Sequence, residues 1–146
     1  MPHPIETPRA TDFPRLLEVW EAAVRATHDF LEEHDIQLLK PLLIEQYFPQ
    51  VQLSCMRGDD GTIVGFLGYA EGKVEMLFVD PLHHGMGIGR ALLNDAVTRL
   101  GANQVDVNEQ NTQALGFYLS QGFAVEGRSP LDGGGRPFPI LHLRLA

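Results

Sequence analysis

Two periods in the spacing of hydrophobic residues divide this chain into helices and strands. Apolar residues recur every three or four positions from residue 13 to 31, which predicts an amphipathic helix that begins after Thr11-Asp12. A second helix is predicted over residues 35–46, with a break or kink at Pro41. Two further helices are expected at 88–100 and 111–121. Short apolar runs predict strands over residues 5–9, 51–56, 62–69, 74–79, 104–107, 123–126 and 140–145.

The order of these elements predicts one α/β domain over residues 1–146. Gly58-Asp59-Asp60-Gly61 and Glu71-Gly72-Lys73 are turn signals, so the early strands should form an antiparallel meander. Two β-α crossovers follow, and they favour a parallel pair of strands at mid-chain. We therefore expect a mixed, mostly antiparallel central sheet with flanking helices, and a ligand site where neighbouring strands diverge at their carboxyl ends.

Composition narrows the classes of function. The chain has 146 residues and a net charge of -8, which argues against a nucleic-acid partner. No run of 18 apolar residues and no basic-then-apolar start occurs, so neither a membrane segment nor a secretion signal is expected, and a cytoplasmic location is predicted. The single cysteine, Cys55, lies in an apolar stretch and is expected to be a core thiol.

A glycine-rich loop after the apolar strand at 74–79 is the first chemical signal. That strand is apolar except for Glu75, so it is expected to be buried on both faces, and Asp80-Pro81 should end it. Gly85, Gly87 and Gly89 would let a ligand approach the backbone closely. The helix that follows is capped at its other end by Gly101, and its free N–H groups predict an anion site.

Two familiar phosphate loops do not fit this stretch. A dinucleotide-binding loop needs G-x-G-x-x-G after the first strand, and a P-loop needs G-K-[ST], whereas Arg90-Ala91 follows Gly89 here. A merely flexible glycine turn is the remaining alternative, which the loop by itself leaves open.

The segment at 106–123 adds a second signal, in the right order along the chain. Its residues Asn111, Ala114, Phe117, Tyr118, Gly122 and Phe123 resemble the pattern Asn-x-x-Ala-x-x-Phe-Tyr-x-x-x-Gly-Phe of the GNAT (Gcn5-related) N-acetyltransferases. Residues 84–89 are similar to that family's pyrophosphate loop, Arg/Gln-x-x-Gly-x-Gly/Ala, with His84 at the first position. Stretches at 27–31, 107–111 and 127–141 resemble a small bacterial, YjaB-like subgroup, proposed to acetylate protein lysine or a broad range of amines.

The resemblance implies a GNAT acyl-CoA N-acyltransferase fold, acetyl-CoA as donor, a primary amine as acceptor and direct transfer in a ternary complex. It implies that residues 77–79 meet the pantetheine arm and that N–H groups from Gly85 to Arg90 hold the pyrophosphate. Tyr118 would protonate the departing thiolate. The implied cofactor-binding residues are Leu77, Phe78, Val79, His84, Gly85, Met86, Gly87, Ile88, Gly89, Arg90, Asn111, Phe117 and Tyr118. No metal is expected, and family members often form homodimers.

Each catalytic assignment has a plainer alternative. Tyr118 could be an ordinary core aromatic residue, and Glu75 is either the general base or a solvent-facing residue near a sheet edge. His28 is either a base that overhangs the acceptor site or a helix-terminal histidine favoured by the helix dipole. The acidic residues between 29 and 35 would attract a cationic amine or form a solvated helix face. Because His84 departs from the pattern, an acyl-CoA-binding sensor with little catalysis is the alternative function.

Overall fold

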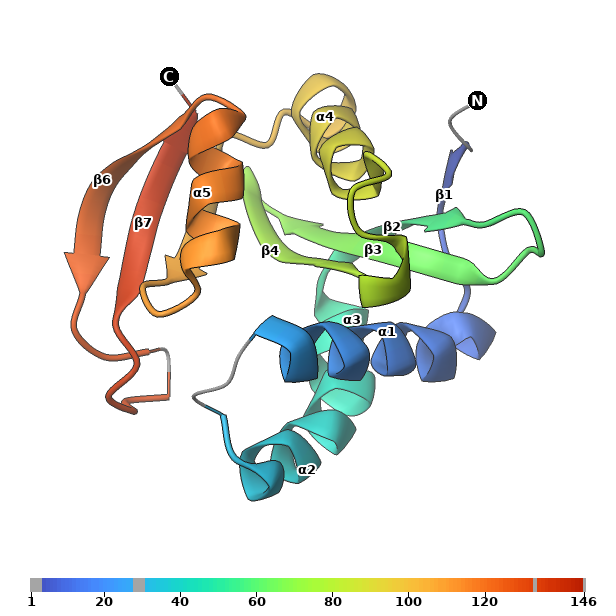
Figure 1. Ribbon diagram of the computed structural model, residues 1–146, viewed down its shortest axis with the longest axis horizontal. Coiled ribbons are helices and arrows are strands. Elements are labelled where there is room, and N and C mark those ends of the chain that lie inside the picture. Colours follow the sequence, from blue (N-terminus) through green and yellow to red (C-terminus); the bar gives the residue numbers. More distant parts are fainter. Residues whose placement is uncertain (1–3, 28–30, 133, 146) are drawn as a thin grey trace.

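The computed structural model describes residues 4–27, 31–132 and 134–145 and contains one seven-stranded sheet (Figure 1). The strands are β1 (Ile5–Glu6), β2 (Gln52–Arg57), β3 (Ile63–Ala70), β4 (Lys73–Val79), β5 (Gln104–Asn108), β6 (Phe123–Ser129) and β7 (Ile140–Leu145). The helices are α1 (Phe13–Thr27), α2 (Glu33–Leu42), α3 (Phe48–Gln50), α4 (Ile88–Leu100) and α5 (Thr112–Ser120). The predicted α/β class and mixed sheet are confirmed.

The strand order is β1-β2-β3-β4-β5-β7-β6, and within the described part of the chain β4 and β5 are the only parallel pair. These two strands pair at Lys73–Gln104 and Val74–Val105. No further pairing joins them within the described residues, so the sheet splits between them toward their carboxyl ends. β7 runs between β5 and β6 and pairs with both, an insertion that the order of elements along the chain does not reveal.

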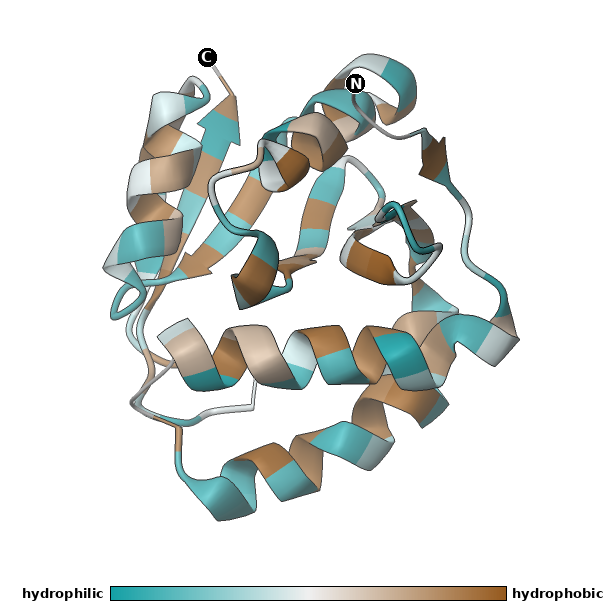
Figure 2. Cartoon of the chain, turned by 45° about the vertical axis from the view of Figure 1, so that its right-hand side comes forward, coloured by the Kyte–Doolittle hydropathy of each residue, from teal (hydrophilic) through white to brown (hydrophobic). Residues whose placement is uncertain are grey.

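Two hydrophobic cores lie on opposite faces of the sheet. One packs α4 and α5 against residues such as Val105, Val107 and Leu143, and the other packs α1 and α2 against residues such as Phe66 and Phe78. In Figure 1, α4 lies above strands β2 to β4, and α1 and α2 lie below them. Figure 2 shows hydrophobic and hydrophilic bands that alternate along α1 and α2, as expected for helices with one buried face.

The second predicted helix is longer than expected. Pro41 lies inside α2, and the chain continues through a π-helical turn at Leu43–Tyr47 into α3, which ends at Gln50. Proline offers no N–H to the helix ladder, and the widened turn after it lets the chain continue in helical form. The first strand, in contrast, is shorter than predicted and ends at Glu6, before Pro8.

The predicted burial of the central strand on both faces is wrong for most of its length. Val74 is buried, but Glu75 is exposed and residues 76–79 are only partly buried. The pairing with β3 shifts between Gly68–Met76 and Tyr69–Val74, so Glu75 is the extra residue of a β-bulge. The bulge coincides with the split from β5, and the opened strand borders cavities on both of its faces.

Candidate active site

A cavity of about 360 Å³ lies where β4 separates from β5, on the side of α4 and α5. It is lined by Ala23, Thr27, Leu77, Phe78, Val79, His83, His84, Gly85, Gly87, Ile88, Gly89, Arg90, Asn111, Gln113, Ala114, Phe117 and Tyr118. The fold therefore brings together every residue expected to bind the cofactor except Met86. The Met86 side chain is 68% exposed and does not line the cavity.

The glycine loop takes a backbone conformation that other residues rarely adopt. Gly85 and Gly87 have φ angles of +79° and +80°, and a Cβ atom on either would meet nothing within 4 Å. The requirement for glycine there is conformational, because space is available. The first helical bond of α4 runs from the Ala91 N–H to the Gly87 carbonyl at 3.0 Å. The N–H groups of residues 88–90 precede that bond, and N–H groups at a helix start are able to bind an anion.

The start of α4 is held tightly against the sheet. A Cβ atom added to Gly65 of β3 would lie 2.8 Å from Cγ2 of Ile88, closer than real contacts allow. The absent side chain at this strand position therefore lets the first turn of α4 approach β3. This close contact fixes the height of the helix start above the sheet.

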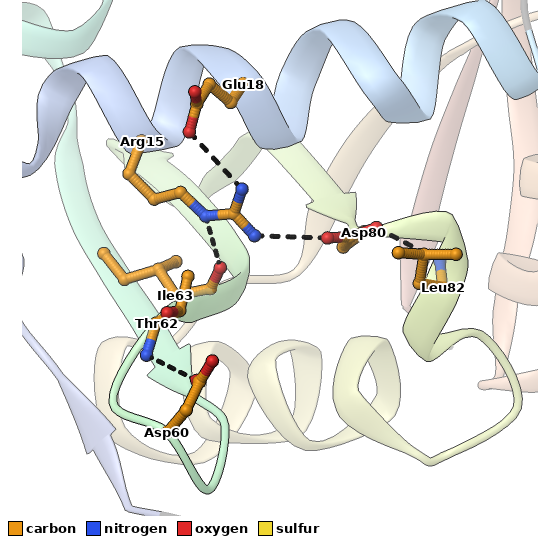
Figure 3. A network of polar contacts seen from close by, with 7 residues as sticks. All are labelled: Arg15, Glu18, Asp60, Thr62, Ile63, Asp80 and Leu82. Atoms are coloured by element: carbon orange, nitrogen blue, oxygen red, sulfur yellow. Dashed lines mark hydrogen bonds and ion pairs between the residues drawn. The ribbon is translucent and has the colours of Figure 1, made fainter.

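A polar network anchors the other end of the loop to α1 (Figure 3). Asp80 is buried; its Oδ1 accepts from the Leu82 N–H at 3.1 Å, and its Oδ2 accepts from Arg15 Nη2 at 3.1 Å. Arg15 also donates from Nε to the carbonyl of Ile63 at 2.9 Å. Asp80 therefore does more than end a strand, because it ties the turn into the glycine loop to α1 and β3.

The opposite wall of the cavity is formed by α5. Asn111 caps this helix, and its Oδ1 accepts from the Ala114 N–H at 3.1 Å. Phe117 and Tyr118 pack edge to face with ring centroids 5.2 Å apart. In the turn before this helix, Asn108 Oδ1 accepts from the Gln110 N–H at 2.9 Å.

Tyr118 is 6% exposed and lines the cavity. Its hydroxyl makes no hydrogen bond with any residue that the structure describes, and burial raises the pKa of the phenol well above its ordinary value. A phenol with a raised pKa is protonated at neutral pH and can act as a proton donor.

The two adjacent histidines differ in position. His83 lines the cavity, and its buried Nδ1 has no hydrogen-bond partner among the described residues. His84, the residue at the first pattern position, also lines the cavity but is exposed. His, Cys, Asp and Glu side chains are the usual metal ligands. In the part of the chain described, no three such side chains gather into a possible metal site.

A second cavity, of about 490 Å³, lies on the face of the sheet covered by α1 and α2. It is lined by Trp20, Leu39, Leu43, Tyr47, Gln50, Val51, Ala70, Glu75, Met76 and Phe78. Among the described residues that line it, Glu75 supplies the only charged side chain, and Phe78 lines both cavities. Glu75 is exposed as one alternative predicted, but it belongs to a central strand and not to a sheet edge. The other predicted base, His28, lies outside the described residues.

The loop between β6 and β7 is tied to the start of α2. Asp35, which was expected either to attract a cationic amine or to lie on a solvated helix face, is 2% exposed and forms an ion pair with Arg136. The Arg136 guanidinium lies 5.2 Å from the centre of the Phe138 ring, and its charge lowers the pKa of Asp35. Asp132 Oδ1 accepts from the N–H of Arg136 at 2.9 Å and shapes the loop. The pair links two segments about a hundred residues apart in the sequence (Figure 1).

A row of polar side chains crosses four strands beside the split. Its members are Lys73 of β4, Asp106 of β5, His142 of β7 and Ser129 of β6. His142 Nδ1 lies 2.7 Å from Asp106 Oδ1, and its Nε2 lies 2.7 Å from Ser129 Oγ. Asp106 Oδ2 pairs with Lys73 Nζ. Sequence reasoning missed this polar row because its members meet only through strand register.

The chain matches a family described as Acetyltransferase (GNAT) domain over residues 27–139. It is 40% identical over 129 residues to a protein named peptidyl-lysine N-acetyltransferase YjaB from Salmonella typhimurium, covering 88% of each chain. The protein of the same name from Escherichia coli is 38% identical over 128 residues, or 88% of this chain and 86% of that one.

Solved structures of similar proteins have the same fold as this chain. The solution structure of apo YjaB from Escherichia coli superimposes with a TM-score of 0.89 at 35% identity, over 98% of this chain and 97% of that one. A PaiA N-acetyltransferase from Thermoplasma acidophilum, solved in complex with coenzyme A, shares the fold over the full length of both chains, with a TM-score of 0.75 at 22% identity. Within the described residues, no helix has the length and apolar character to cross a membrane.

Proposed function

Because the chain belongs to the GNAT family of acetyl-CoA-dependent N-acetyltransferases, we propose that it acetylates lysine side chains of proteins by direct transfer in a ternary complex. The observation that carries the proposal is the cavity at the split between β4 and β5, where the glycine loop, β4 and Tyr118 converge. The names of the two relatives given above support lysine as acceptor, and a small-molecule amine remains the broader alternative.

The residues of the first cavity fit the donor. In this proposal the N–H groups of residues 88–90 hold the pyrophosphate, and backbone groups of 77–79 hold the pantetheine arm. The left-handed glycines support this role, since they keep side chains away from the loop surface. The unpartnered Nδ1 of His83 gives a bound ligand one further polar contact, whereas exposed His84 contributes little to binding.

Tyr118 is proposed as the acid. Its buried hydroxyl lies in the donor cavity and has a raised pKa, so it holds a proton that a departing thiolate can take. An N–H of β4 near Phe78 and Val79 is proposed to stabilise the oxyanion that forms during acyl transfer. Phe78, Val79 and Tyr118 all line the first cavity, and Phe78 also lines the second cavity.

The acceptor is proposed to enter from the second cavity. An aromatic and aliphatic wall suits the apolar stem of a lysine, and Glu75 suits its ammonium group. Glu75 is thus proposed to attract the ammonium and to be one group able to take its proton. The organisation as one GNAT domain over 1–146, the cytoplasmic location, a homodimer and the absence of a metal stay predictions.

The test measures release of CoA from acetyl-CoA in the presence of lysine peptides, polyamines and small amines, with Tyr118→Phe beside the unmodified protein. We expect release that depends on lysine peptides and falls by about 10²-fold or more in the variant, with the Kd for acetyl-CoA unchanged. Unchanged turnover in Tyr118→Phe would remove Tyr118 from the chemistry. Tight acetyl-CoA binding without release from any amine would instead favour the sensor, the alternative that exposed His84 supports.

A further inference from the structure

We propose that the polar row, formed by Lys73, Asp106, His142 and Ser129, accepts the proton that the acceptor amine must lose. The inference rests on the proposed N-acetyl transfer and adds a catalytic group to it. An amine is mostly protonated at neutral pH, and only its neutral form can attack a thioester. The reaction therefore needs a proton acceptor on the acceptor side of the split.

The hydrogen bonds of the polar row fix the tautomer of His142. Both oxygens of an ionised Asp106 can only accept, and Oδ1 lies 2.7 Å from His142 Nδ1. Nδ1 must therefore carry the hydrogen of the neutral ring, which leaves the lone pair on Nε2. The Ser129 hydroxyl, 2.7 Å from Nε2, then donates to it. The polar row thus ends in the Ser129 hydroxyl, which is hydrogen-bonded to a nitrogen of His142 that can accept a proton.

Strand alternation places the polar row on the acceptor face. Val105 and Val107 are buried in the core with α4 and α5, so Asp106 between them points to the opposite face. Leu141 and Leu143 are buried in that same core, so His142 also points away from it. The opposite face is the one where α1 and α2 pack and where the Glu75 cavity lies.

The ends of the polar row coincide with the split and with the acceptor-side loop. Lys73 belongs to one of the two residue pairs that still join β4 to β5, and Asp106 lies just beyond them on β5. Ser129 is the last residue of β6, before the loop that Arg136 ties to the start of α2. The polar row therefore extends from the split to this loop on the acceptor face of the sheet.

The surroundings leave His142 accessible. Gly127 of β6 faces its ring, and even a Cβ there would stand 3.7 Å from Cδ2. The arginines of β6 and β7 are paired elsewhere, Arg144 with Glu126 of β6 and Arg128 with Glu109 in the turn after β5. The charges that face the ring from the neighbouring strands are therefore those of Asp106 and, through it, Lys73.

The proposed step moves one proton. The amine N–H bond breaks and leaves its electron pair on nitrogen for the bond to the acyl carbon. The proton passes to Ser129 Oγ while the Ser129 hydroxyl proton passes to His142 Nε2, which gives an imidazolium beside Asp106. The thiolate leaves with the C–S electron pair and takes the Tyr118 proton. The nitrogen loses its second proton to water once it is bonded to the acyl carbon. Exchange with water then returns the His142 proton to solvent and reprotonates Tyr118.

The test compares His142→Gln, Ser129→Ala and Arg144→Gln with the unmodified protein in the CoA-release assay. Arg144→Gln is the matched control, because it removes an exposed ion pair on the same strand without touching the polar row. Each protein is assayed from neutral to alkaline pH with a lysine peptide. A second peptide carries S-aminoethylcysteine in place of lysine, whose amine loses its proton more readily. Thermal denaturation checks that each variant folds.

We expect His142→Gln to lower kcat about 10²-fold at neutral pH and Ser129→Ala to lower it by a smaller factor. Both losses should shrink as pH rises and with the more acidic amine, and the KM for acetyl-CoA should stay unchanged. Unchanged turnover in His142→Gln, or a loss that is the same at every pH, would overturn the role of the polar row as proton acceptor and leave the proposed acetyl transfer intact. If His142→Gln fails to fold, Ser129→Ala decides by the same criteria. An unmodified protein that releases no CoA with either peptide would overturn both the proposed acetylation of lysine and the role of the polar row as proton acceptor.

Discussion

Asp80 offers a direct test of how the glycine loop is held. Its carboxylate makes two kinds of contact, one with the backbone N–H of Leu82 and one with the guanidinium of Arg15 (Figure 3). Asp80→Ala removes both, whereas Asp80→Asn keeps a side-chain oxygen for the Leu82 N–H and loses the ion pair. Glu18→Gln is the control, because Glu18 is an exposed partner of the same arginine.

The contacts set the expected size of the effect. A side-chain cap of a helical turn is worth about 1 kcal/mol. The ion pair adds about 1 kcal/mol, less than a fully buried one, because the Arg15 side chain is 29% exposed. Asp80→Ala should therefore lower the free energy of unfolding by about 2 kcal/mol and the Tm by roughly 4–8 °C. Asp80→Asn should cost about half as much.

Urea denaturation near neutral pH measures the free energy of unfolding, and CoA release measures the KM for acetyl-CoA. We expect that KM to rise in the order Glu18→Gln, Asp80→Asn, Asp80→Ala, because the loop loses its attachment to α1 step by step. The reasoning would be refuted if Asp80→Ala matched Glu18→Gln in both stability and KM. A loss of stability without a change in KM would separate Asp80 from the loop.

Three further predictions follow from single residues. Gly87→Ala should lower the free energy of unfolding by about 1–2 kcal/mol, because φ is +80°, and should weaken acetyl-CoA binding. Gly116→Ala, in helical backbone with open space, should leave stability unchanged or raise it. Denaturation and calorimetric acetyl-CoA binding are measured for both variants. Burial raises the pKa of the Cys55 thiol from 9.0 to about 11, so its contribution to stability is complete below about pH 9 and declines from there to about pH 11; denaturation against pH should show this decline and Cys55→Ala should lack it. Arg136→Ala frees the loop before β7 from α2, so the KM for a lysine peptide should rise while that for acetyl-CoA stays constant. The same kinetics for Arg128→Ala, which breaks an exposed pair, should show no change, and equal effects of the two variants would contradict a role for the loop.

The donor half of the site could be predicted from sequence because its determinants are local. A strand followed by Asp80-Pro81, glycines at alternate positions and a helix occupies about twenty consecutive residues, and its geometry depends on backbone preferences of those residues. The cap at Asn111 and the pair Phe117-Tyr118 likewise belong to one short helix and its entry. These features keep their relative positions whatever the rest of the chain does, and the fold then needs only to place the two segments on either side of one cavity.

The acceptor half was decided by the tertiary structure. The bulge at Glu75 changes which face of β4 a residue occupies, and the insertion of β7 between β5 and β6 brings His142 beside Asp106 and Ser129. The burial of Asp35 depends on an arginine about a hundred positions away. A side chain's face on a strand alternates with every residue, so one shift in register reverses it, and no local pattern encodes which distant strand becomes the neighbour. The sequence by itself therefore determined the two segments that line the first cavity, and only the packing of distant strands determined which side chains meet on the opposite face of the sheet.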